Sequence, residues 1–180
     1  MEILRTGIDG LLLIQPQVFE DERGHFMEFF RKDRLREVGI AHEFVQENES
    51  RSKKNVLRGL HYQEPPFEQG KLVRVICGKV QDVAVDIRKN SPTFGRWFSH
   101  LLSGENKTML WIPQGFAHGF LTLEDDTVFQ YKCTGYYNKA SEGSIRWNDP
   151  QLAIDWKVND PLLAEKDSIA PLFNQLKTNF

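Results

Sequence analysis

The residues with the most evident chemistry lie in three short segments. Residues 58–63 (Arg-Gly-Leu-His-Tyr-Gln) place a guanidinium three positions before the imidazole of His61. Lys71 follows, and His118 lies in a glycine-containing run over residues 111–120. An imidazole accepts protons near neutral pH, whereas guanidinium and ammonium groups hold anions. These residue types, set among strand-forming residues and tight turns, predict an anion-binding pocket with a base inside a β-barrel.

His61 is the best candidate for that base. Arg58 and Lys71 are close in sequence, and nearby cations keep an imidazole neutral and able to accept a proton. A neutral imidazole also needs an acceptor for its other N–H, which an aspartate from elsewhere in the chain can supply. The alternative is a histidine that serves only packing or the surface.

A metal site is a second alternative for His61 and His118. Metal-binding cupin-like barrels typically offer a His-x-His pair, a downstream Glu and a later His. Here the pair is broken, because Gln63 stands where the second His belongs, and Glu64 and Glu68 fall in a proline-containing loop. Since a metal needs three or four well-placed ligands, we predict that none is bound.

Other polar residues each admit two interpretations. Tyr131, on a predicted strand, either packs or donates a proton. Gln46 and Asn48 fall on one face of an extended run, which suits either a polar ligand or a solvated face. Arg23 resembles a solvated turn charge, and Asp167 either caps a helix or has a catalytic role.

Composition limits the class of protein. Lys and Arg number 23 and Asp and Glu number 25, and a net charge of −2 argues against a nucleic-acid or anionic-membrane partner. Cys77 and Cys133 lack CxxC spacing, so we expect two buried free thiols in a reducing compartment. No signal peptide is visible, and no apolar run reaches the about 20 residues that span a bilayer. We expect a soluble, cytoplasmic protein.

Hydrophobic alternation predicts an all-β fold. Extended runs are expected over residues 11–14, 24–30, 44–48, 72–77, 80–88, 109–112, 116–121 and 127–133. Gly78 predicts a hairpin between two of them. Helices are expected over residues 33–38, capped by Asp33, and from Ser168 through Leu176. The prediction is one domain over residues 1–180, a jelly-roll barrel with short peripheral helices.

Taken together, these segments resemble the dTDP-4-dehydrorhamnose 3,5-epimerase family along nearly the whole chain. The resemblance is carried by residues 19–26 (FEDERGHF), 46–50 (QENES), 58–63 (RGLHYQ), 70–75 (GKLVRV), 82–88 (DVAVDIR), 91–95 (SPTFG), 112–120 (IPQGFAHGF), 147–150 (WNDP) and 165–167 (EKD). It implies a cupin-like, metal-free jelly roll. The family's usual serine before the last motif is Ala164 here, a difference that touches no assigned role.

The resemblance implies a role for each matching position. His61 matches the general base, Asp167 the carboxylate that orients it, and Tyr131 the general acid. Lys71 matches a cation beside the C4 oxygen of the sugar. The implied substrate contacts are Arg23, Glu28, Gln46, Asn48, Arg58, His118, Glu142 and Lys166, with Tyr136 stacked on thymine and Tyr137 a less certain neighbour of it.

The implied activity is epimerisation at C3 and C5 of dTDP-4-dehydro-6-deoxy-D-glucose, in dTDP-L-rhamnose biosynthesis and without a cofactor. The implied assembly is a homodimer with exchanged N-terminal strands. A monofunctional 3- or 5-epimerase, or a ketoisomerase on a related nucleotide-sugar, is the alternative within this scaffold. From a different class, a binding-only cupin would not need His61, Asp167 and Tyr131 together.

Overall fold

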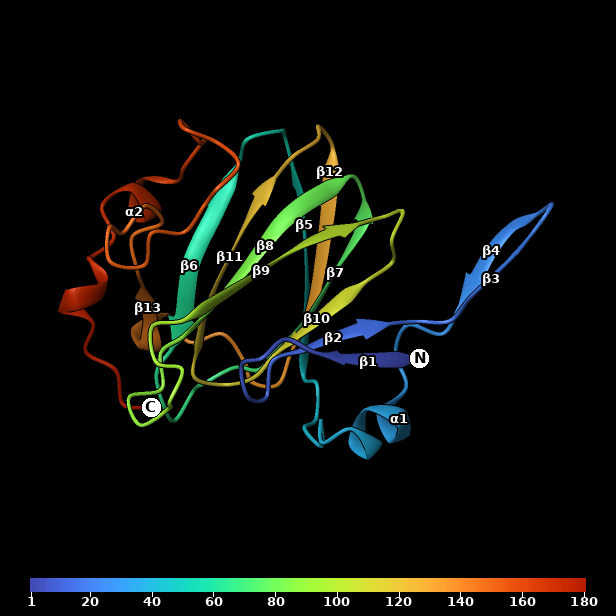
Figure 1. Ribbon diagram of the computed structural model, residues 1–180, viewed down its shortest axis with the longest axis horizontal. Coiled ribbons are helices and arrows are strands. Elements are labelled where there is room, and N and C mark those ends of the chain that lie inside the picture. Colours follow the sequence, from blue (N-terminus) through green and yellow to red (C-terminus); the bar gives the residue numbers. More distant parts are fainter.

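Two antiparallel sheets lie face to face and make up most of the molecule (Figure 1). The computed structural model describes all of residues 1–180. The six-stranded sheet has the order β1 (Glu2–Arg5), β2 (Leu12–Gln15), β10 (Met109–Ile112), β7 (Lys71–Cys77), β12 (Thr127–Cys133) and β5 (Gln46–Ser52). The five-stranded sheet has the order β13 (Glu142–Ser144), β6 (Leu57–Gln63), β11 (Phe116–Thr122), β8 (Lys79–Asp86) and β9 (Trp97–Ser103). The predicted all-β jelly roll is therefore confirmed, although β1, β6, β9 and β13 of these two sheets were not among the runs expected to be strands.

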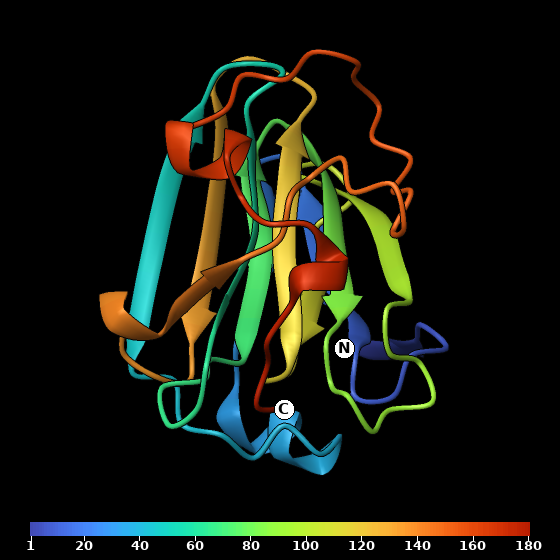
Figure 2. The same cartoon turned by 90° about the vertical axis from the view of Figure 1, so that its left-hand side faces the viewer.

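The main core lies between the two sheets, and a second core covers the outer face of the five-stranded sheet. Alternation along β8 explains both. Val80 and Ala84 point into the space between the sheets, whereas Val83 and Val85 point outward. The outward face is covered by residues 145–173 (Figure 2). Trp156 of this segment belongs to the apolar cluster on that face. Because both faces of β8 are buried, the strand carries almost no solvated side.

Gly78 does not form the predicted hairpin. The strands on either side of it, β7 and β8, belong to different sheets and do not pair. Gly78 has φ +80°, and a Cβ there would lie 2.3 Å from the Thr127 hydroxyl. The glycine therefore marks a crossing between sheets. Its local requirement, a positive φ, is the same one that a hairpin turn imposes.

The predicted C-terminal helix is also wrong. Helix α2 covers only Glu165–Ser168, and a 3₁₀ turn follows at Phe173–Gln175. Pro171 interrupts the pattern because it has no N–H and disfavours the helical region at the residue before it. Ile169, expected on the buried face, is 71% exposed.

The first helix is close to its prediction. Helix α1 covers Lys32–Glu37 and is followed by Gly39, at φ +89°. Arg31 occupies the N-cap position, so Asp33 is not the cap and lies in the first turn. None of the helices has the length and apolar character that crossing a bilayer requires. Cys133 is buried as expected, but Cys77 is exposed, and both thiols are free.

A two-stranded hairpin, β3 (Val18–Asp21) and β4 (Gly24–Met27), stands away from the sandwich (Figure 1). It pairs with no other strand of the chain. Phe19 and Phe26 on this hairpin are exposed. A lone hairpin is marginally stable in water, so this one requires further support.

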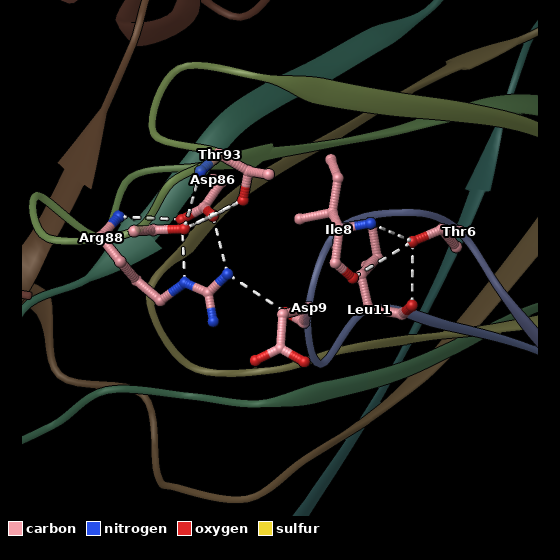
Figure 3. A network of polar contacts seen from close by, with 8 residues as sticks. Thr6, Ile8, Asp9, Leu11, Asp86, Arg88 and Thr93 are labelled. Carbon is pink, nitrogen blue, oxygen red and sulfur yellow. Dashed lines mark hydrogen bonds and ion pairs between the residues drawn. The ribbon is translucent and has the colours of Figure 1, made fainter.

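The end of β8 is fixed by a buried carboxylate (Figure 3). Asp86 accepts hydrogen bonds from the hydroxyls of Ser91 and Thr93, both at 2.6 Å, and from Arg88 Nη2 at 2.7 Å. Arg88 Nη2 also donates to the carbonyl of Asp9 at 3.1 Å. The network thus ties the N-terminal loop to the five-stranded sheet, away from the residues that carry the predicted chemistry.

Strands β6 and β11 approach each other closely at two glycines. Gly59 has φ +133°, and a Cβ there would lie 2.5 Å from Gly119 Cα and 2.9 Å from the carbonyl oxygen of His118. Only a residue without a side chain permits this contact. The close approach lies beside the pair His61 and His118, which face each other across the two strands.

We expect Gly59→Ala to lower the free energy of unfolding by about 2 kcal/mol or more, because a methyl group there meets backbone that cannot yield. The matched control is Gly7→Ala, which also has a positive φ (+84°) but no atom within 4 Å of its Cβ. It should cost about 1 kcal/mol from backbone strain alone. Urea unfolding measures both, and equal losses would contradict the packing argument.

Candidate active site

A cavity of about 750 Å³ opens between the two sheets. Ten of the predicted site residues line it, namely His61, Tyr131, Asp167, Lys71, Gln46, Asn48, Arg58, His118, Glu142 and Lys166. Three do not, namely Arg23, Glu28 and Tyr136. The cavity therefore collects side chains from both sheets, from α2 and from the loop after β12.

His61 is held by a buried carboxylate. Its Nε2 lies 2.6 Å from Asp167 Oδ1, and Asp167 is 2% exposed. Asp167 Oδ2 also lies 3.5 Å from the Gly59 backbone N–H, at the limit of a hydrogen bond. With Nε2 taken up by Asp167, Nδ1 is the ring nitrogen that remains for a ligand. Asp167 therefore orients His61 and does not cap α2, whose cap position is Ala164.

His118 is held in the same way by a residue that the sequence did not single out. Its Nε2 lies 3.1 and 3.0 Å from the two oxygens of Asp82, which is fully buried on β8. His61 and His118 are direct cross-strand partners. A signal was available, since Asp82 is a carboxylate at an inward position of an apolar strand, and such a group requires a partner.

The opposite sheet contributes an amine and a phenol. Burial lowers the pKa of the Lys71 ammonium, and nearby negative charges partly oppose this shift. Burial raises the pKa of Tyr131, so its phenol keeps its proton at neutral pH. Lys71 Nζ lies 5.9 Å from the centre of the Tyr131 ring. The two groups thus face the imidazoles across the cavity.

Strand β5 lines one wall with amides. Gln46 Nε2 donates to Asn48 Oδ1 at 3.1 Å, and Gln46 Oε1 accepts from the Tyr137 backbone N–H at 2.9 Å. Asn48 Nδ2 lies 3.8 Å from the sulfur of Cys133. The alternation predicted for residues 44–48 therefore does direct these amides toward the cavity.

Charged residues surround the mouth of the cavity. Lys166 Nζ donates to Glu142 Oε1 at 2.5 Å, and the Tyr137 hydroxyl donates to Glu142 Oε2 at 3.1 Å. Burial raises the pKa of Glu142, but the hydrogen bond and charge of Lys166 lower it more. Arg58 donates to the Ser52 hydroxyl at 3.2 Å. These cations are positioned to meet an anionic ligand as it enters.

The two adjacent tyrosines differ in position. Tyr136 is 70% exposed and lies outside the cavity, whereas Tyr137 lines it. Tyr136, the expected stacking residue, therefore does not line the cavity of its own chain, and its role stays a prediction. Consecutive residues in an irregular loop give no periodic signal that distinguishes them.

Arg23 and Glu28 lie apart from the cavity of their own chain. Arg23, in the turn of the β3–β4 hairpin, pairs with Asp21 at 2.5 Å in solvent. Glu28 lines a separate hollow that also includes Phe19 and Phe26. Neither residue can reach a ligand in this chain's own cavity without a large movement of the hairpin.

Comparisons with known proteins agree with this geometry. A family model described as dTDP-4-dehydrorhamnose 3,5-epimerase matches residues 5–175. The dTDP-4-dehydrorhamnose 3,5-epimerase of Shigella flexneri is 54% identical over 168 residues, covering 93% of each chain. A crystal structure of dTDP-6-deoxy-D-glucose-3,5-epimerase from Legionella pneumophila, in complex with dTDP-4-keto-L-rhamnose, has 54% identity and a TM-score of 0.94. It covers 98% of this chain and 94% of its own.

A further relative has narrower activity. A 3′-monoepimerase from Streptomyces bikiniensis, in complex with dTDP-quinovose, has 36% identity and a TM-score of 0.87, covering 92% of this chain and 85% of its own. The jelly-roll fold with its internal histidines is that of a cupin-like sugar-nucleotide epimerase. The chain belongs to the dTDP-4-dehydrorhamnose 3,5-epimerase family.

We expect Lys71→Met to stabilise the protein at neutral pH, because the site disfavours the ammonium, as its lowered pKa shows, and the variant carries no charge there. Since the folded pKa of Lys71 is lowered, the ammonium penalty is complete below that pKa. The penalty then disappears as the pH rises through it toward the unfolded value. The advantage of the variant should therefore shrink with increasing pH.

The free energy of unfolding in urea, measured across the alkaline range, tests this expectation. The control is Lys132→Met, since Lys132 pairs with Glu47 at 2.8 Å near the surface and its loss should not stabilise. A destabilised Lys71→Met variant at neutral pH would rule out the burial argument.

Proposed function

We propose that this chain epimerises C3 and C5 of dTDP-4-dehydro-6-deoxy-D-glucose to give dTDP-4-dehydro-L-rhamnose. The observation that carries the proposal is the pairing of His61 with Asp167 on one side of a cavity that has Lys71 and Tyr131 on the other. The Legionella pneumophila relative, bound to dTDP-4-keto-L-rhamnose, supports the choice of ligand.

The chemistry begins at the ketone of the substrate. A carbonyl at C4 acidifies the C–H bonds at C3 and C5, because the resulting anion is delocalised onto oxygen. His61, oriented by Asp167, removes the proton through Nδ1. Lys71 stabilises the enolate oxygen, and one preorganised donor of this kind is worth about 2.7–4 kcal/mol. The ketone already activates the substrate. We therefore predict that no metal or redox cofactor is needed.

Tyr131 returns the proton to the opposite face of the sugar. It lies on β12, in the sheet across the cavity from His61. Its raised pKa keeps the phenol protonated, as a proton donor requires. A base on one side and an acid on the other invert the carbon, whereas one group doing both would restore it.

The nucleotide diphosphate is assigned to the mouth of the cavity. Arg58 and Lys166 bind its charge, and the diphosphate displaces Glu142 from Lys166. Gln46, Asn48 and His118 make polar contacts within the cavity. The thymine is assigned to Tyr136, the predicted stacking residue, and to its neighbour Tyr137, whose ring lines the cavity.

A monofunctional epimerase is the second candidate. The Streptomyces bikiniensis relative is a 3′-monoepimerase with the same fold, so the fold alone does not determine how many carbons are inverted. Proton NMR of the product, which reports the stereochemistry at both carbons, separates the two activities. It also detects the ketoisomerase alternative.

We further propose that the protein works as a homodimer in which the β3–β4 hairpin of one subunit completes the cavity of the other. The hairpin carries exposed Phe19 and Phe26 and pairs with nothing in its own chain. A second copy would cover these rings and bring Arg23 and Glu28 to a ligand. We also propose that the chain folds as one domain and works in the reducing cytoplasm.

The activity is tested by deuterium exchange. In deuterated water, the wild-type protein should incorporate deuterium at C3 and C5 of the substrate, because both protons are exchanged with solvent through the enzyme. His61→Asn should abolish exchange at both carbons, since it removes the base. Tyr131→Phe should allow proton removal but block inversion. Full deuterium incorporation by His61→Asn would overturn the assignment of the base.

The exchanged hairpin is tested by mixing two inactive variants, Arg23→Ala and His61→Asn. If Arg23 serves the partner's cavity, each heterodimer contains one site with both wild-type residues, and a random mixture should recover about a quarter of the activity. If Arg23 serves its own chain, mixing restores nothing. Sedimentation must show dimers, and an active monomer would contradict the proposal.

A further inference from the structure

Asp82 has the surroundings of a functional carboxylate, although it does not line the cavity. It is fully buried on β8, in the apolar space between the sheets. Its two oxygens have one hydrogen-bond partner, His118 Nε2, at 3.1 and 3.0 Å. A buried carboxylate with a single partner is costly, and a fold that served packing alone would be better stabilised by an apolar residue there.

The contact with Asp82 determines what His118 can offer to a ligand. Because Nε2 faces Asp82, Nδ1 is the nitrogen left for the cavity that His118 lines. The ring is also stacked on Phe129, with centroids 6.1 Å apart and planes at 22°. The plane of the His118 ring and the nitrogen that it presents to the cavity are thus both constrained. A donor role at Nδ1 requires the imidazolium form, in which both ring nitrogens carry protons and Asp82 accepts from one of them.

The two histidines form a matched arrangement across neighbouring strands. His61 and His118 are cross-strand partners, and each is bound at Nε2 by a buried aspartate. Those aspartates come from opposite sides, Asp167 from α2 and Asp82 from β8. The cavity therefore has two His–Asp pairs, of which the proposed mechanism uses only one.

Asp82 also acts on the other sheet. Its negative charge favours the ammonium form of Lys71, against the effect of burial. The other groups acting on Lys71 are Cys133, Glu142 and Lys166, and of these four Asp82 is the only fully buried carboxylate. One interior anion thus supports two hydrogen-bond donors, His118 and Lys71, which line the cavity from opposite sheets.

We propose that Asp82 is a positioning residue that holds His118 as a second donor, beside Lys71, to the oxygen of the enolate. This inference rests on the proposed function and adds one group to its mechanism. His118 Nδ1–H and Lys71 Nζ share the negative charge that develops on the ketone oxygen. Asp82 itself touches no substrate and acts mainly through His118, with a smaller effect of its charge on Lys71.

The test is the kinetics of Asp82→Asn, which keeps the shape but removes the charge. We expect kcat to fall about 10–100-fold with KM nearly unchanged, as for other residues that orient a functional group. The matched control is Asp86→Asn, four residues along the same strand, which is equally buried but bonded to Arg88, Ser91 and Thr93 (Figure 3). It should lower the thermal midpoint and leave kcat and KM unchanged.

A double-mutant cycle separates positioning from mere stability. If Asp82 acts mainly through His118, the double variant Asp82→Asn/His118→Ala should lose little more activity than His118→Ala alone. Independent, multiplying losses in kcat would overturn the inference. So would an Asp82→Asn variant as active as Asp86→Asn. A wild-type protein that does not exchange deuterium would instead refute the proposed function, so the two failures are distinguishable.

If Asp82→Asn does not fold, the wild-type protein decides. Nitrogen-15 NMR of labelled histidines, with His118 assigned from the His118→Ala spectrum, reports which ring nitrogens carry protons. We expect protons on both Nε2 and Nδ1 of His118. An unprotonated Nε2 would mean that Asp82 does not accept its hydrogen bond, and an unprotonated Nδ1 would mean that His118 cannot donate to the enolate; either result ends the proposal.

Discussion

The hydrogen bond between His61 and Asp167 is the contact on which the site depends. It joins residues 106 positions apart, one in the middle of a central strand and one in a single helical turn near the end of the chain. To form it, residues 145–173 must pack back over the outer face of the five-stranded sheet, where Leu152, Trp156 and Phe173 are buried. The apolar burial of that segment therefore places Asp167, at 2% exposure, within hydrogen-bond distance of the His61 imidazole.

Burial creates the chemistry of the opposite sheet at a cost in stability. Lys71 and Tyr131 lie above an apolar core that includes Val73, Val75 and Phe129. Low polarity disfavours charge, so it lowers the pKa of the amine and raises that of the phenol. The phenol therefore keeps its proton, although Asn48 and the charge of Arg58 oppose the shift in its pKa. The negative charges that act on the amine, including Asp82 on the other sheet, partly oppose the lowering of its pKa and so link the two sheets electrostatically.

Much of the fold was predictable because alternation is a local property. The runs at 109–112 and 127–133 agree with β10 and β12 to the residue, and the amides of β5 face the cavity as expected. The errors have local causes too. Gly78 has a positive φ, which a hairpin turn and a crossing between sheets both require. The apolar residues around Pro171 have helical spacing, but proline prevents the helix there. Asp82 was seen only as one member of an alternating strand.

The sequence by itself determined the chemical groups, the strands that carry them and the face of each strand on which they lie. It also carried the motifs of the family, which the comparisons confirm. Only the tertiary structure decided that Asp82 meets His118, that Tyr137 and not Tyr136 lines the cavity, and that the hairpin with Arg23 points away from its own site. Alternation specifies a side chain's face relative to its own strand. It does not specify which strand becomes the neighbour, because that choice depends on burial summed over contacts distant in sequence.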